Sequence, residues 1–214
     1  MGRLTPPGSG LPLAVVEVLE RGDITFFYRP LVQSAEARSF RVGVQSFFAV
    51  LSPGERQLHR RLRIGRKRMP VAPGERLWAR IERVGSLDRV LADQLEPERY
   101  HTKTRGDRFQ PEARPVAQGC YAVVRHDEHC HLVYRVEHHE EDDDIPDEVR
   151  VPDAAGHLLL FERAPGAGAM WTVAGDPGYL DEEGAEIVLV GADDEPEREL
   201  GIDILPASVE RDPV

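Results

Sequence analysis

The chain has 214 residues, of which 41% are hydrophobic and 30% are charged, and its formal net charge at pH 7 is −11. This size and composition are typical of one or two soluble globular domains and exclude a fibrous repeat, a disulfide-rich miniprotein and a wholly disordered chain. No apolar run approaches the roughly 20 residues that a bilayer-spanning helix needs.

The cellular location and redox state follow from two further features. The first residues lack the long apolar core and small-residue cleavage site of a secretory signal, so we expect a cytoplasmic protein. In such a chain, Cys120 and Cys130 are expected to be free thiols rather than a structural disulfide.

Most apolar segments are short, rich in β-branched or aromatic residues and bounded by Gly or Pro, which is typical of strands. The predicted strands are Leu13–Leu19, Ile24–Arg29, Gly43–Leu51, Leu58–Ile64, Leu77–Val84, Cys120–Arg125, His131–Val136, His157–Glu162 and Glu186–Val190. One helix is predicted over 86–95, because Ser86 can cap it, apolar residues recur at helical spacing and Pro97 follows its end.

These elements predict a β-rich α+β protein made of two mainly antiparallel halves packed together, with one clear short helix. Strong alternation with few helices argues against a doubly wound parallel sheet. A local echo supports neighbouring strands: Pro53–Arg56 recurs as Pro73–Arg76, and each copy is a Pro-Gly turn followed by a strand. The two strands that follow these turns are expected to be adjacent in one antiparallel sheet.

Charge divides the chain into two halves. Residues 1–118 hold 21 Lys and Arg against 13 Asp and Glu, whereas residues 119–214 hold 6 against 25. This asymmetry indicates either an anionic partner for the basic half or attraction between the halves, of which the second is the simpler interpretation. We expect a basic half over 1–100, a linker or long surface loop over 101–118, an acidic half over 119–202 and a loose tail over 203–214, with a single folding unit as the alternative.

The basic half contains the first candidate site. Basic side chains cluster on or beside predicted strands. The aromatic residues on nearby predicted strands are Phe26, Phe27, Tyr28, Phe47, Phe48 and Trp78. The candidate ligand-binding residues are Arg60, Arg61, Arg63, Arg66, Lys67, Arg68, Arg80 and Arg83. Aromatic rings on a cationic sheet can bind single-stranded nucleic acid, but strand aromatics are more often core residues and no nucleic-acid-binding signature is visible, so nucleic acid is not favoured.

The second candidate site is a hairpin in the segment 120–131. With Asp127-Glu128 as a two-residue turn, residue 126 faces 129 and residue 124 faces 131, so His126, His129 and His131 share one face. Three imidazoles can bind a divalent metal and leave a position open for water, as in catalytic zinc sites. The alternative is a set of exposed turn histidines with no metal, because the spacing matches no stringent metal motif. The same register places Cys120 and Cys130 on opposite faces.

Other chemistries find no matching motif. The chain has no phosphate-binding loop that ends in Gly-Lys-Ser/Thr, no dinucleotide fingerprint between a strand and a helix, and no Gly-x-Ser-x-Gly nucleophile elbow. No cofactor other than a divalent metal is indicated, and whether the protein is an enzyme stays open.

Several phrases taken together resemble an uncharacterised family of conserved hypothetical proteins of bacteria and fungi. They include Glu20-Arg21-Gly22-Asp23-Ile24 leading to Phe27-Tyr28-Arg29-Pro30, then Gly65–Pro70 (GRKRMP) and Glu183–Ala192 (EGAEIVLVGA). The resemblance covers the chain from about Val15 to Ala192. It implies a soluble single folding unit and transfers no activity or catalytic residue.

The leading hypothesis from the sequence is a non-catalytic binding or interaction protein whose basic strands contact an anionic ligand or an acidic protein partner. The alternative is a metal-dependent, hydrolase-like enzyme built on the three histidines. Neither hypothesis involves a membrane.

Overall fold

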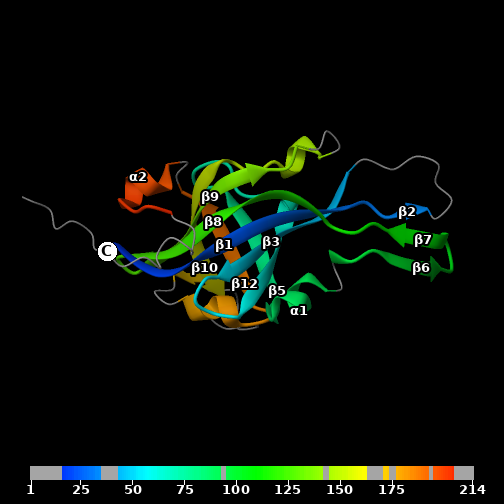
Figure 1. The fold of residues 1–214 in the computed structure, drawn as a ribbon, viewed down its shortest axis with the longest axis horizontal. Coiled ribbons are helices and arrows are strands. Elements are labelled where there is room, and N and C mark those ends of the chain that lie inside the picture. Colours follow the sequence, from blue (N-terminus) through cyan, green and yellow to red (C-terminus); the bar gives the residue numbers. More distant parts are fainter. Residues whose placement is uncertain are drawn as a thin grey trace, which may run out of the picture.

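A computed structural model describes residues 16–34, 43–92, 95–141, 145–162, 171–173, 177–192 and 195–204. Eight antiparallel strands form a closed barrel (Figure 1). Around the barrel their order is β10 (Ala154–Glu162), β12 (Glu186–Gly191), β5 (Arg76–Gly85), β4 (His59–Ile64), β3 (Val44–Pro53), β1 (Val16–Pro30), β8 (Arg114–His126) and β9 (His129–His139). Pairing of β9 with β10, from Arg135 opposite Ala154 to His131 opposite Leu158, closes the ring.

A smaller sheet extends from one end of the barrel, at the right of Figure 1. It consists of β2 (Gln33–Ser34), β7 (Gly106–Gln110) and β6 (Glu98–Thr102) in that order. A further strand, β11 (Trp171–Val173), pairs with the end of β10. The helices are short: α1 (Leu87–Leu91) and α2 (Pro196–Leu200), with 3-10 turns η1 (Gly65–Lys67), η3 (Asp147–Val149) and η4 (Pro177–Asp181). Within the described ranges, none is long and apolar enough to cross a membrane.

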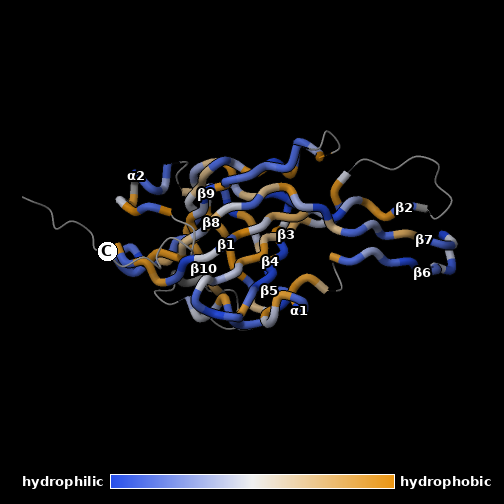
Figure 2. Tube along the Cα trace, in the orientation of Figure 1, coloured by the Kyte–Doolittle hydropathy of each residue, from blue (hydrophilic) through white to orange (hydrophobic). Residues whose placement is uncertain are grey.

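Side-chain alternation along each strand fills the barrel. Successive residues point to opposite faces, so β1 sends Ile24, Phe26 and Tyr28 inward, where all three are buried. Figure 2 shows the resulting change between hydrophobic and hydrophilic positions along the barrel strands. A second, smaller cluster lies on the outside of β8 and β9, where Leu200 and Ile204 pack against Cys120, Ala122, Val124 and Val133.

The β-rich prediction is confirmed, and the predicted segments fall on β1, β3, β4, β5, β8, β9, β10 and β12 wherever the structure describes them. The two halves, however, do not pack as separate layers. The first contributes β1, β3, β4 and β5, the second contributes β8, β9, β10 and β12, and both complete one barrel. As the Pro-Gly echo predicted, β4 and β5 are neighbours.

The structure differs in detail from the predicted elements. The segment 101–118, expected to be a linker or a long surface loop, completes β6, forms β7 and begins β8. The helix expected over 86–95 ends at Leu91, since Ala92 has extended backbone angles (φ −67°, ψ 171°). Of the tail expected over 203–214, the structure describes Asp203, which is exposed, and Ile204, which is buried. Residues 205–214 lie outside the described residues, as do residues 13–15 of the first predicted strand.

Gly119 marks a place where the barrel backbone is tightly packed. A Cβ atom there would lie 2.0 Å from the carbonyl oxygen of Arg135 and 2.8 Å from Cα of Val136, next to a register shift between β8 and β9. Because both neighbours are backbone atoms, they cannot move away as a flexible side chain would. We expect Gly119→Ala to lower the free energy of unfolding by about 3 kcal/mol or more, measured by urea denaturation.

Gly74→Ala is the matched control for this prediction. Gly74 has a φ of +76° but no atom within 4 Å of its added Cβ, so the control measures backbone strain without a clash. It should cost only about 1 kcal/mol. Equal losses in the two variants would contradict the steric explanation for Gly119.

Candidate functional site

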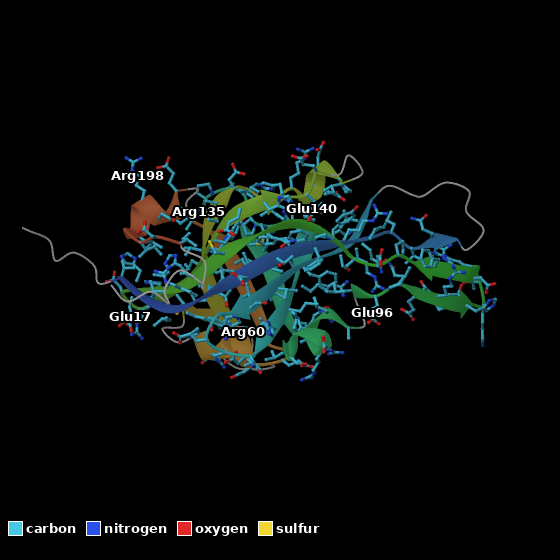
Figure 3. The ribbon with its side chains drawn as sticks, in the orientation of Figure 1. Glu17, Arg60, Glu96, Arg135, Glu140 and Arg198 are labelled. Carbon is cyan, nitrogen blue, oxygen red and sulfur yellow. The ribbon has the colours of Figure 1, made fainter. Side chains whose placement is uncertain are left out.

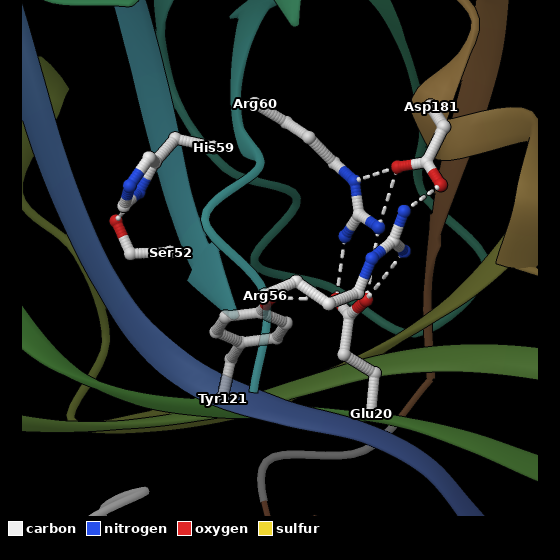
Figure 4. A network of polar contacts seen from close by, with 7 residues as sticks. All are labelled: Glu20, Ser52, Arg56, His59, Arg60, Tyr121 and Asp181. Carbon is white, nitrogen blue, oxygen red and sulfur yellow. Dashed lines mark hydrogen bonds and ion pairs between the residues drawn. The ribbon is translucent and has the colours of Figure 1, made fainter. Parts of the chain in front are cut away.

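Arg60 lies inside the barrel, where it forms a buried ionic cluster (Figure 4). Its side chain is 1% exposed, Nη1 and Nη2 donate to the two carboxylate oxygens of Glu20 at 2.5 and 2.9 Å, and Nε donates to Oδ1 of Asp181 at 2.7 Å. Tyr121 Oη donates to Glu20 at 2.6 Å, and Arg56 donates to Asp181 at 2.7 Å. The carboxylates of Glu20 and Asp181 are thus both paired within the protein.

The pKa values in this cluster follow from burial and pairing. Burial lowers the pKa of Arg60, but the hydrogen bonds and negative charges around it outweigh burial and raise the pKa overall. For Asp181, burial raises the pKa, whereas Arg56 and Arg60 lower it by more, so the net shift is downward. Arg60 and Asp181 therefore stay ionised across the physiological range.

Arg61 points to the outside of the barrel but is also buried, beneath α1. Its Nη1 donates to the backbone carbonyls of Val90 at 2.7 Å and Ala92 at 2.8 Å, and Nε lies 3.3 Å from Oε2 of Glu82. The guanidinium also lies over the ring of Phe48, 5.7 Å from its centroid. The sequence placed Arg60 and Arg61 on a ligand-binding surface; that placement is corrected, because both charges are used inside the fold.

Three other predicted cations have partners within the protein. Arg68 binds both carboxylate oxygens of Glu75 at 3.0 and 2.5 Å, and Arg83 donates to Glu183 at 3.1 Å. Lys67 Nζ donates to the carbonyl of Val44. Arg83–Glu183 and Arg60–Asp181 each join the basic first half to the acidic second half. Attraction between the halves thus accounts for part of the charge asymmetry.

Of the remaining predicted cations, Arg63 and Arg80 lie on the outer face of β4 and β5, and Arg66 lies in η1, directly after β4. We define the Trp78 surface as Arg63, Arg66, Arg76, Trp78 and Arg80. Trp78 is 52% exposed, and Arg76 and Arg80 flank it at alternate positions of the same strand. Among the described residues, Arg66, Arg76 and Arg80 have no hydrogen-bond or ion-pair partner. Arg63 is half exposed and bonds Ser46 Oγ at 2.9 Å and Glu82 at 3.3 Å.

Local backbone geometry positions part of this surface. Arg66 and Lys67 have φ values of 51° and 60°, a left-handed conformation that is uncommon outside glycine and that concentrates at functional sites. The preceding residue, Gly65, lies beside Trp78, and a Cβ at Gly65 would be 3.7 Å from Cβ of Trp78. Gly65 therefore places no side chain of its own beside Trp78 on the β4 side.

A polar pocket adjoins the Trp78 surface. It has a volume of about 400 Å³ and is lined by Arg61, Arg80, Ile81, Glu82, Arg83, Glu183 and Gly184. Its two carboxylates already pair with Arg61, Arg63, Arg83 and Arg89. Arg80 therefore brings an unpaired positive charge to both the pocket and the exposed indole.

Sequence reasoning missed Arg76 as a member of the site, and it named Trp78 only among the aromatic residues near the basic cluster. The sequence contains the signal, because in Arg76-Leu77-Trp78-Ala79-Arg80 the alternate positions are charged or aromatic and the intervening ones are small or aliphatic. Leu77 and Ala79 are buried inside the barrel, which fixes the other three outward. By contrast, the predicted strand aromatics Phe26, Tyr28 and Phe47 are core residues.

The histidine hairpin has the predicted register. His126 is opposite His129, Val124 is opposite His131, and the rings of His126 and His131 lie 6.3 Å apart between centroids. Burial, and then the neighbouring His126 and His129, lower the pKa of His131 to about 4. Yet the described part of the chain contains no group of three or more His, Cys, Asp or Glu side chains arranged to hold a metal. The three-histidine metal site stays a prediction.

The cysteine predictions are confirmed: both are free and buried, Cys120 outside the barrel and Cys130 in its core. One interior group was not anticipated. His157 is fully buried, stacks on Tyr134 at 5.7 Å between ring centroids, and places Nε2 3.2 Å from the carbonyl of Pro70. It also lines a pocket of about 290 Å³ whose other lining residues include Pro70 and Gly191. Burial lowers its pKa to about 4, against the opposing effect of the Pro70 and Leu132 carbonyls.

No protein-family model matches this chain, and no curated protein or solved structure is significantly similar to it. The resemblance to an uncharacterised family stays a prediction. Function therefore has to be argued from the geometry of the chain itself.

Proposed function

We propose that the protein binds an anionic ligand on the Trp78 surface. The observation that carries this proposal is Trp78, 52% exposed between Arg76 and Arg80, whose charges have no partner among the described residues. The other arginines of β4 and β5, namely Arg60, Arg61 and Arg83, pair with carboxylates of the protein. A cationic area that the fold leaves uncompensated is a site where an external anion gains the most.

The net negative charge of the protein opposes the binding of an anion. With a net charge of −11, the protein as a whole repels anions, so retention on a polyanion requires a local cationic area. Salt also screens the attraction between exposed charges, over a Debye length of about 8–10 Å at ordinary ionic strength. Binding is therefore expected to be salt-sensitive.

The test is a combined variant, Arg66→Gln with Arg76→Gln and Arg80→Gln. We expect the unchanged protein to be retained on immobilised heparin or polyphosphate at low ionic strength and released as salt rises. The combined variant should elute without retention, because it loses three of the four exposed guanidinium groups that face the ligand.

The matched control is Arg105→Gln with Arg150→Gln and Arg198→Gln. It removes the same charge from exposed arginines away from β4 and β5; Arg198, for example, projects from α2 at the far end of the molecule (Figure 3). The control should keep the retention of the unchanged protein. Elution of both variants at one salt concentration, or no retention of the unchanged protein, would refute the proposal.

A further inference from the structure

We infer that the anionic ligand is single-stranded nucleic acid, with a base stacked on Trp78 and the neighbouring phosphates bound by arginine. This inference rests on the proposed function, and it adds the chemical class of the ligand. It depends on the combination of an exposed indole with guanidinium groups on both sides of it.

The exposed indole is the first step. A surface that binds its ligand through charge alone does not need an exposed tryptophan. Exposure of so large an apolar ring to water is also unfavourable. Trp78 is nevertheless 52% exposed, and Gly65 beside it lacks the side chain that could cover it. A flat base stacked on the indole would bury this apolar area, and aromatic platforms bind successive bases in this way.

The spacing of the arginines is the second step. Residues two apart on a strand are about 7 Å apart on the same face, so Arg76 and Arg80 lie on opposite sides of Trp78 along β5. Arg63 is directly opposite Arg80 on β4, and Arg66 follows at the end of that strand. Guanidinium groups therefore flank Trp78 on both sides along β5, with Arg63 across from Arg80 on β4, which matches a base between its flanking phosphates.

The type of cation is the third step. All four exposed cations of the Trp78 surface are arginines, whose planar guanidinium can bind phosphate through two parallel hydrogen bonds and can stack on a base. An acidic peptide would use the charges but has no flat ring to cover the exposed part of the indole. A duplex keeps its bases stacked on each other, so only an unpaired strand can offer a base to Trp78.

The test uses fluorescence of Trp78 in a Trp171→Phe background, in which Trp78 is the one remaining tryptophan. The probes are an oligothymidylate of about 12 nucleotides, an abasic phosphodiester chain of the same length, and polyglutamate. We expect the oligothymidylate to quench the fluorescence and to bind at least about fivefold more tightly than the abasic chain. Its log affinity should fall with log salt at a slope of about −3, for four arginine–phosphate contacts.

Variants separate stacking from charge. Trp78→Ala should weaken oligothymidylate binding at least about fivefold, and Trp78→Phe should retain part of it. Neither change should alter binding of the abasic chain. Equal affinity for oligothymidylate and the abasic chain, tighter binding of polyglutamate, or no effect of Trp78→Ala would overturn this inference while leaving anion binding intact. If none of the polyanions binds, the proposed function itself fails.

Discussion

Replacing Arg60 with methionine is expected to lower the free energy of unfolding by about 3–5 kcal/mol, the largest effect of any single side-chain change considered. The variant leaves Glu20, whose side chain is 9% exposed, and Asp181 without their main counter-charge inside the barrel. Arg56 still lies 2.7 Å from Asp181 but 3.8 Å from Glu20, so Glu20 bears most of the penalty. Urea denaturation at neutral pH measures the loss.

Arg63, an outward-facing and half-exposed arginine of the same strand, supplies the control. Arg63→Met removes a half-exposed guanidinium from β4 and should cost less than about 1 kcal/mol. The double variant Arg60→Met/Glu20→Gln removes the buried carboxylate charge of Glu20 together with the arginine that neutralises it. Part of the lost stability should therefore return. Equal losses for Arg60→Met and Arg63→Met would show that the buried cluster contributes no more than a surface ion pair.

The strands of this fold could be predicted from sequence because each depends on its own alternation of apolar and polar residues. The hairpin register at His126 and His129 was likewise local, since a two-residue turn fixes it. Closure of the barrel was not predictable in this way. It depends on pairing β1 with β8 and β5 with β12, strands that lie far apart in the chain.

The candidate site shows the same limit at the level of single side chains. Arg60 and Arg63 are alike in the sequence, yet one is buried and the other half exposed. Alternation alone shows that they face opposite sides, but not which side is the interior. The acidic partners of Arg60 are 40 and 121 residues away, so its pairing follows only from the closed barrel. The outward positions of Arg76 and Trp78, by contrast, follow from local alternation, because Leu77 and Ala79 at the intervening positions are buried.

Acidification is expected to destabilise the protein between about pH 6.5 and pH 4, with His157 as a main cause. Burial holds the pKa of His157 near 4 in the folded state, whereas the unfolded chain binds a proton near the ordinary value of 6.5. The unfolded state therefore binds more protons within this window, and stability falls as the pH falls through it. The contribution is complete above pH 6.5, and about 3 kcal/mol of it is lost by pH 4.

The variant His157→Gln tests this pH dependence, because glutamine keeps a donor for the Pro70 carbonyl but cannot titrate. Its free energy of unfolding, measured by urea denaturation across the window, should vary with pH less steeply than that of the unchanged protein. His131→Gln is a parallel control for the other lowered histidine pKa, whose loss falls in the same window and adds to that of His157. Asp181 acts separately, since its pKa is lowered from 3.8 and its stabilisation is lost only at still lower pH. If the His157→Gln profile runs parallel to that of the unchanged protein, the imidazole is not held neutral by the barrel interior, and the acid sensitivity must come from other groups with shifted pKa values, such as His131.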